Sequence, residues 1–117
     1  MHRFKDLQIW ERSRKFSLSI YKATAEFPES EKFGLTNQLR RASVSIPSNI
    51  AEGSSRISNK DFSRFLRISI GSAYEIETQL LIAHDLKFIS TKNLDNLIHE
   101  LESIIKMNSK FLTSLKV

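Results

Sequence analysis

The sequence predicts an all-α protein, an antiparallel up-down-up-down bundle of four helices. Apolar residues recur at spacings of three and four along most of the 117 residues, as expected of helices with one buried face. Only three Gly and two Pro interrupt the chain, and the connections between the periodic segments are short. Because 40% of the residues are hydrophobic, one domain over residues 1–117 can form a modest core.

The first helix is expected over residues 5–27. Leu7, Trp10 and Ile20 lie at helical spacing within it. Pro28 ends the segment, because the residue before a proline disfavours the α conformation.

The second helix is expected over residues 31–52. Its apolar residues have spacings of 4, 3, 4 and 4 and form one stripe, made of Leu35, Leu39, Ala42, Ile46 and Ile50. Gly53 follows directly and is expected to stop the helix.

The third and fourth helices have clear start signals. Ser58 precedes Asp61 by three residues, an acidic variant of the capping box, and the third helix should end near Lys87. Ser90 or Thr91 is expected to cap the fourth helix. The fourth helix has the strongest periodicity in the chain, carried by Leu94, Ile98, Leu101, Ile105, Leu112 and Leu115.

The third helix carries a second apolar stripe opposite its core face. Ile68, Ile82 and Leu86 form this stripe, with Glu75 and Gln79 between them. A helix that is apolar on two faces is usually covered on both, so another subunit is expected to cover this stripe. The alternative is three scattered apolar side chains in contact with water, which are common on protein surfaces.

The composition argues against several kinds of site and segment. No Cys is present, which excludes disulfides, thiolate metal sites and cysteine nucleophiles. The first 16 residues are charged throughout and predict no signal peptide, and no apolar run reaches the roughly 20 residues that span a membrane. The expected chain is soluble and cytoplasmic.

Catalytic and metal-binding patterns are missing from the sequence. Neither His84 nor His99 has a carboxylate three residues earlier, as a di-iron bundle requires. No glycine-rich phosphate loop and no strand-turn-helix context for a nucleophilic serine occur. We therefore expect no metal, no cofactor and no catalytic residue, and an enzyme is the least favoured of the function classes.

The net charge of +5 is unevenly spread. Residues 1–67 contain 13 Lys/Arg and 7 Asp/Glu, whereas residues 68–117 contain 5 and 6. Basic residues of this kind suit phosphate groups and predict a nucleic-acid surface, with a solvated basic face as the alternative. The candidate residues are Arg12, Arg14 and Lys15 on the first helix and Arg56, Lys60, Arg64 and Arg67 around the start of the third.

A polar ribbon runs beside the apolar stripe of the second helix, in "QLRRASVSIPSNIAEG". Its residues have spacings of 3, 4, 4 and 3 and are Gln38, Arg41, Ser45, Asn49 and Glu52. Pro47 has no N–H group, so the carbonyl of Ser43 loses its helical partner and needs a polar neighbour. We expect Arg41 to pair with Glu77 on the third helix. The ribbon either joins helices or contacts a ligand, and its position beside the core favours the first interpretation.

The stretch "FGLTNQLRRASVSIPSNIAEGS" resembles the four-helix-bundle proteins encoded by intervening sequences in bacterial 23S ribosomal RNA genes. The resemblance extends to "KDLQIWERS" and "FLRISIGSAYEIETQLLIAHDL" and covers essentially the whole chain. Ser13 stands where the family pattern leads us to expect Ala. The matching motif positions are Gln38, Arg41, Ser45, Pro47, Asn49, Glu52, Gly53, Glu75 and Glu77.

The resemblance implies an antiparallel four-helix bundle that assembles as a homopentameric ring, without catalytic activity. The family is also similar to the accessory protein of diversity-generating retroelements, a basic pentamer that binds nucleic acid and a reverse transcriptase. The favoured function is therefore non-enzymatic nucleic-acid binding, with RNA favoured over DNA. The alternative is a protein-interaction scaffold whose partner is a reverse transcriptase or a ribosome-associated factor.

Overall fold

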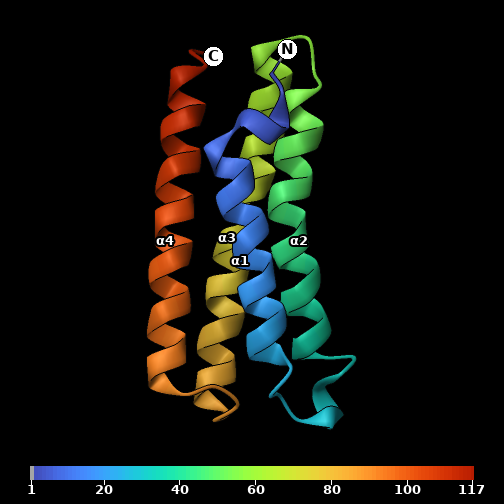
Figure 1. Cartoon of the computed structure of the whole chain (residues 1–117), viewed down its shortest axis with the longest axis vertical. Helices are drawn as coiled ribbons and strands as arrows, with labels where there is room; N and C mark the ends of the chain where they lie inside the picture. Colours follow the sequence, from blue (N-terminus) through green and yellow to red (C-terminus); the bar gives the residue numbers. More distant parts are fainter. Residues whose placement is uncertain (1) are drawn as a thin grey trace.

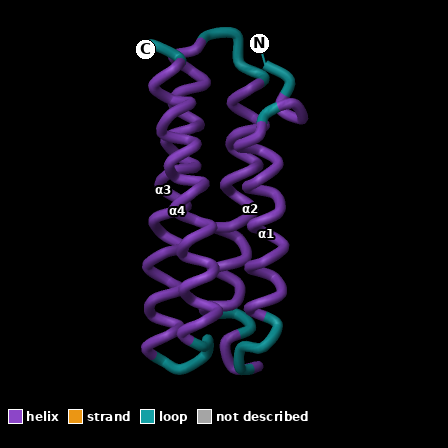
Figure 2. Tube along the Cα trace, turned by 60° about the vertical axis from the view of Figure 1, so that its left-hand side comes forward, coloured by secondary structure: helices purple, strands orange, loops and turns teal. Residues whose placement is uncertain are grey.

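The computed structural model describes residues 2–117, which form four α-helices and, within this range, no β-strand. The helices are α1 (Gln8–Thr24), α2 (Leu35–Ser54), α3 (Asn59–Asp85) and α4 (Thr91–Ser114), and two short 3-10 turns, η1 (Phe4–Asp6) and η2 (Glu29–Glu31), precede α1 and α2. The molecule is a rod of 43 × 23 × 20 Å whose length follows the helices. Figures 1 and 2 show the four helices side by side along this rod.

The two chain ends and the α2–α3 connection lie at the same end of the rod, here called the terminal end (Figure 1). The α1–α2 and α3–α4 connections lie at the other end, here called the distal end. Helix α1 packs against α2 and α4, and α3 packs against the same two helices. Helices α1 and α3 are therefore diagonal neighbours across the core.

Aliphatic side chains from all four helices fill the interior. The largest of them are 0 to 1% exposed and comprise Ile20, Leu39, Ile46, Ile50, Leu66, Ile76, Leu80, Leu101 and Ile104. Burying one such side chain stabilises the fold by about 1.5–3 kcal/mol. At the terminal end Phe62 packs against His2 and Phe111, with ring centroids 5.3 and 5.5 Å away, and the latter two rings also contact each other.

The first two helices are shorter than predicted. Leu7 is extended (φ −86°, ψ 123°), so α1 begins at Gln8, and the chain leaves the helix after Thr24. Phe27, beyond the end of the helix, is still buried and packs on Phe88. Gly34 has a non-helical conformation (φ −109°, ψ −119°) and separates η2 from α2.

Gly53 does not stop α2, as the sequence suggested, because it lies inside the helix with α2 continuing to Ser54. A Cβ atom at this position would lie 2.7 Å from Cδ1 of Phe62 and 2.7 Å from Cβ of Phe65. The missing side chain therefore lets α2 and α3 approach closely near their connection, and Gly53 is a packing residue.

The predicted caps of α3 and α4 are confirmed. The Ser58 hydroxyl accepts a hydrogen bond from the Asp61 amide, and the Ser90 hydroxyl accepts one from the Asn93 amide, both at 3.1 Å. Helix α3 ends at Asp85, two residues before the expected limit, because Lys87 is left-handed (φ 64°). The Phe88 amide donates to the Ala83 carbonyl at 2.9 Å, so the turn is a Schellman motif.

Candidate nucleic-acid interface

The basic residues at the start of α3 are held by neighbouring carboxylates and by an aromatic ring. Asp61 accepts a hydrogen bond from Arg64 at 3.0 Å, and Arg56 lies 3.6 Å from the same carboxylate. Arg56 also pairs with Glu52 at 3.4 Å. The guanidinium groups of Arg56 and Arg64 both lie 4.7 Å from the ring centroid of Phe65. Two of the four cations are thus fixed in position and partly neutralised.

Lys60 and Arg67 keep more of their charge available. Neither forms an ion pair within residues 2–117, and both are exposed. Nη1 of Arg67 donates to the Ser63 hydroxyl at 3.3 Å, which orients its guanidinium group. A shallow hollow of about 450 Å³ is lined by Ser58, Lys60, Asp61, Ser63, Arg64 and Arg67. This hollow is wide and cationic, as a surface for phosphate groups requires.

The three candidate residues of α1 point to different neighbours. Arg12 turns toward α4, where its Nη2 donates to the Ser103 hydroxyl at 3.2 Å. Desolvation by burial raises the pKa of the nearby Glu100 above its usual value, while the positive charge of Arg12 opposes that rise. Arg14 stacks on Trp10 at 5.0 Å, and Lys15 pairs with Glu11 at 3.3 Å. Lys15 and Arg14 remain exposed to solvent.

The predicted clusters of α1 and α3 do not form one continuous face, because these helices are diagonal neighbours. Both clusters lie in the half of the rod that includes the terminal end. Three lysines of α4 and the C-terminus reach the same half, although they were not among the sequence-predicted candidates: Lys106, Lys110 and Lys116. The sequence feature that could have identified these lysines is the order of charges along α4, where the acidic residues Asp95, Glu100 and Glu102 precede them.

The carbonyl freed by Pro47 has a partner from another helix. The hydroxyl of Ser17 on α1 donates to the Ser43 carbonyl at 2.8 Å, and both residues are buried. The proline therefore sits inside α2 without leaving its i−4 carbonyl unsatisfied. This confirms the expectation of a polar neighbour, although the neighbour comes from α1 rather than from the ribbon.

The polar ribbon of α2 joins this helix to α3. The hydroxyls of Ser45 and Ser72 are 3.0 Å apart, and the Asn49 amide donates to the Ser45 carbonyl at 2.8 Å. Nε2 of Gln79 on α3 donates to Oε1 of Gln38 at 3.3 Å and to Glu75 at 3.0 Å. Two of the ribbon residues, Gln38 and Ser45, therefore bond across the α2–α3 seam, and Asn49 holds Ser45 from within α2.

The predicted pair of Arg41 and Glu77 is wrong. No ion pair within residues 2–117 joins them, and Arg41 lies on the side of the seam that Glu75 faces. Arg41 and Glu75 instead line an open hollow of about 390 Å³ together with Asn37, Gln38, Ala42, Ser45 and Ser72. Glu52 likewise pairs along the chain with Arg56 and not across the seam.

The second apolar stripe of α3 lies on the surface of the chain. Ile68, Ile82 and Leu86 are 43, 44 and 52% exposed, whereas the exposed Tyr74 and Leu81 lie on a different part of the surface of the same helix. Glu75, from the same face, is also exposed, whereas Gln79 is buried in the α2–α3 seam. The chain itself therefore covers the three apolar side chains of the stripe only in part.

The described part of the chain holds neither a membrane span nor a metal cluster. None of the helices within residues 2–117 combines the length and apolar character needed to cross a membrane. In the same range, no three His, Asp or Glu side chains are grouped closely enough to hold a metal ion.

Comparisons with known proteins agree with this architecture. The fold is similar to that of a protein with unknown function from the S23 ribosomal protein family of Bacteroides thetaiotaomicron, with a TM-score of 0.82 and 23% sequence identity. The likeness covers 90% of this chain and 95% of the other. None of the curated proteins matches the chain. The model of the 23S rRNA-intervening sequence protein family matches residues 5–110, and the chain belongs to this family.

Proposed function

We propose that this up-down-up-down bundle is a cytoplasmic, single-domain, non-enzymatic protein that binds nucleic acid, with RNA favoured over DNA. The observation that supports this most strongly is the hollow at the start of α3. Its cations Lys60 and Arg67 are exposed and free of ion pairs within the described chain. Lys and Arg side chains of this kind contact phosphates without reading the base sequence.

The proposed assembly is a homopentamer. The exposed apolar stripe of α3, with Ile68, Ile82 and Leu86, supports an interface along this helix. Five copies of one weak basic surface can bind a polyanion more tightly than a single copy without any new contact. Assembly and nucleic-acid binding are therefore parts of the same proposal.

An electrophoretic mobility shift with structured ribosomal RNA, unrelated RNA and duplex DNA at two salt concentrations tests the function. We expect binding that weakens steeply with salt, because counterions are released from the phosphates. The double variant Lys60→Gln/Arg67→Gln should bind more weakly, whereas Lys92→Gln, on the distal half of α4, should bind as the original chain does. Affinity that is unchanged by salt and by the double variant would contradict the proposal.

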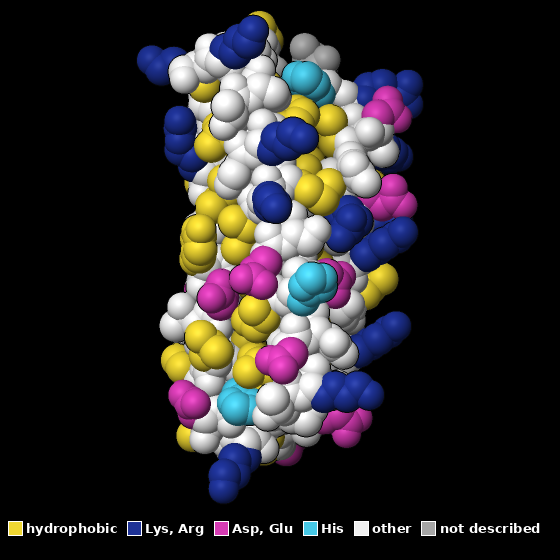
Figure 3. Space-filling model, turned by 90° about the vertical axis from the view of Figure 1, so that its left-hand side faces the viewer, with side chains coloured by type: hydrophobic (Ala, Val, Ile, Leu, Met, Phe, Trp, Pro, Cys, Tyr) yellow, Lys and Arg dark blue, Asp and Glu magenta, His cyan; other side chains and the backbone are white. Residues whose placement is uncertain are grey.

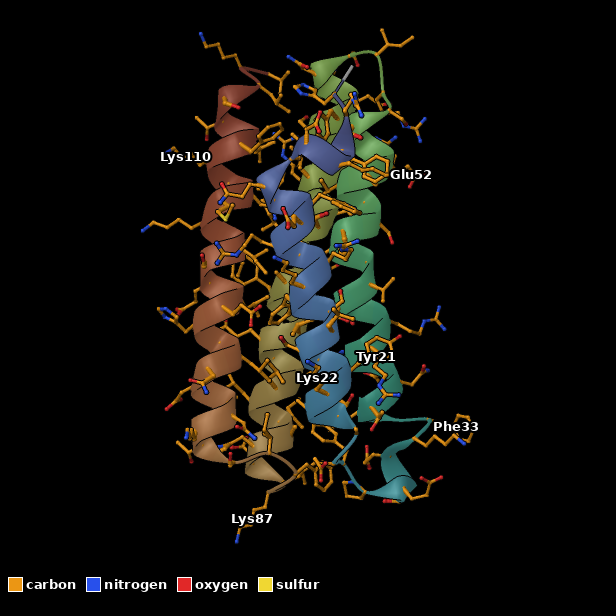
Figure 4. All side chains as sticks on the ribbon, in the orientation of Figure 1. Tyr21, Lys22, Phe33, Glu52, Lys87 and Lys110 are labelled. Atoms are coloured by element: carbon orange, nitrogen blue, oxygen red, sulfur yellow. The ribbon has the colours of Figure 1, made fainter. Side chains whose placement is uncertain are left out.

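A second candidate function is a scaffold for a protein partner such as a reverse transcriptase or a ribosome-associated factor. Two apolar side chains in the connections favour it, since Phe33 is 87% and Ile57 is 92% exposed. Figure 4 shows Phe33 pointing away from the bundle at the distal end. A pull-down with and without nuclease separates the candidates, because partners that survive nuclease support a scaffold and partners lost on nuclease support nucleic-acid binding.

A further inference from the structure

The fold sorts the charges of this chain along the length of the rod. When each helix is divided at its midpoint, the half with the terminal end comprises residues 2–15, 45–72 and 103–117. It contains twelve Lys/Arg and four Asp/Glu, a net charge of +8. The remaining residues, 16–44 and 73–102, contain six Lys/Arg and nine Asp/Glu, a net charge of −3. The whole positive excess of the protein thus lies in one half.

Helix α4 shows this separation of charge along the rod most strongly, although the net charge of the second part of the sequence does not reveal it. Its distal half carries Asp95, Glu100 and Glu102, and its terminal half carries Lys106 and Lys110, with Lys116 just beyond the helix. On the face in Figure 3, Lys and Arg side chains occupy the centre of the upper part, toward the terminal end, and Asp and Glu the centre of the lower part. Lys106, Lys110 and Lys116 are exposed and form no ion pair within residues 2–117.

We propose that the terminal end binds a segment of double-helical nucleic acid laid across it, and that Lys106 and Lys110 of α4 contact its phosphates together with Lys60 and Arg67 of α3. The proposal rests on the proposed function and deepens it. It names the form of the nucleic acid, the end of the bundle that binds it, and two contact residues outside the sequence-predicted clusters.

The dimensions of the rod support a duplex. Its cross-section is 23 × 20 Å. A nucleic-acid duplex carries one negative charge per about 1.7 Å of its axis, so a segment about 20 Å long presents roughly twelve charges. The four proposed contact residues come from the neighbouring helices α3 and α4 and are spread in two dimensions. A spread of this kind matches the phosphates of two strands better than the single track of one strand.

The side chains at this end also favour a duplex over a single strand. Proteins that bind single strands stack bases on exposed aromatic rings. Among the described residues the exposed aromatic side chains are Tyr21, Phe33 and Tyr74, and all three belong to the distal half. Phe4, Trp10 and Phe111, in the terminal half, are partly buried and packed against other rings. The terminal end therefore offers cations without a stacking surface.

The distal half serves as an internal control because its net charge is negative. Lys87 and Lys92 lie there on and near the α3–α4 connection, exposed like Lys106 and Lys110 and also free of ion pairs within residues 2–117. Figure 4 marks Lys110 near the terminal end and Lys87 at the distal end. Replacing either pair by Gln removes the same charge, so only position distinguishes the two variants.

The test measures affinity for an RNA duplex, a DNA duplex and a single-stranded RNA of equal length over a range of salt concentrations. For Lys106→Gln/Lys110→Gln we expect duplex affinity to fall by roughly tenfold or more near 0.1 M salt, and the slope of log affinity against log salt to become shallower by about 2. Lys87→Gln/Lys92→Gln should leave both values unchanged. All four positions are exposed, and thermal melts check that each variant remains folded.

Three results would overturn the proposal. The first is that Lys106→Gln/Lys110→Gln and Lys87→Gln/Lys92→Gln lose affinity equally while Lys60→Gln/Arg67→Gln still weakens binding. This result would reject the contact residues of α4 but not the proposed function. Another is tighter binding of the single strand than of either duplex. The third is no binding of any nucleic acid by the unaltered chain, which rejects the proposed function as well.

Discussion

Among single residues, Ser17 of α1 has a structural role in the neighbouring helix α2. It is buried on α1 and donates to the Ser43 carbonyl on α2, the group that Pro47 leaves without a helical partner. A buried carbonyl without a donor costs about 1–3 kcal/mol. The proline within α2 therefore depends on a hydroxyl from a neighbouring helix.

This dependence predicts coupling between Ser17 and Pro47. Ser17→Ala should lower the free energy of unfolding by about 1–3 kcal/mol, because the Ser43 carbonyl loses its donor. In the Pro47→Ala background the restored backbone N–H satisfies that carbonyl, so the same change should cost less than about 0.5 kcal/mol. Urea unfolding of the four chains of this double-mutant cycle measures the difference. Equal costs in both backgrounds would show that the Ser17 hydroxyl does not serve the freed carbonyl.

The sequence predicted the need for this hydrogen bond but not its source. A proline inside an amphipathic helix reveals the carbonyl that lacks a donor, because that relation is local. Which helix supplies the donor depends on how α1 and α2 pack. The Arg41 and Glu77 prediction failed for a similar reason, since helical spacing gives the face of a residue only coarsely.

At the scale of elements, the close approach of α2 and α3 depends on Gly53. The helix continues through this residue, and Phe62 and Phe65 occupy the space where a side chain would lie. The sequence suggested a helix stop because glycine after an amphipathic segment is a frequent C-terminal signal. A glycine needed for packing has the same one-letter signature, so only the structure separates the two roles.

Two glycine variants test this interpretation. Gly53→Ala should destabilise the bundle by about 1–3 kcal/mol, because overpacking outweighs the gain in helix propensity. Gly71→Ala is the matched control, since Gly71 is an exposed residue of α3 and a Cβ atom there would meet no neighbouring group within 4 Å. It should stabilise the fold by about 0.5–1 kcal/mol. Denaturant unfolding of both variants measures whether each change raises or lowers the free energy of unfolding. Stabilisation by Gly53→Ala would contradict the packing role.

At the scale of the whole molecule, the proposed ring depends on the outer face of α3. Ile82→Asp places a charge within the apolar stripe, so it should dissociate the assembly into monomers. Leu18→Asp is the control, because Leu18 on α1 is even more exposed, at 58%, and lies outside the stripe. Mass measurement in solution should give a pentamer for the original chain and for the control. A monomeric original chain, or an unchanged mass for Ile82→Asp, would reject this interface.

The fold was largely predictable from the sequence, whereas the charge pattern was not. Helical periodicity and the caps Ser58 and Ser90 depend on neighbouring residues, and they placed all four helices to within a few residues. Charges counted over residues 1–67 and 68–117 did not reveal that the lysines of α4 belong to the basic region. The chain reverses direction at each connection, so each of these segments reaches both ends of the rod. Residues far apart in the sequence then share one end of the rod.

The separation of charge gives the molecule an electric dipole along its long axis, 43 Å in extent. A dipole of this kind turns its positive end toward a polyanion during approach, within about 8 Å at physiological salt. Cyclic symmetry orients every subunit alike, so the proposed pentameric ring has one basic and one acidic side if its rods stand parallel to the symmetry axis. Such a ring distinguishes its two sides before any contact forms, and added salt lowers the rate of productive encounters as well as the affinity.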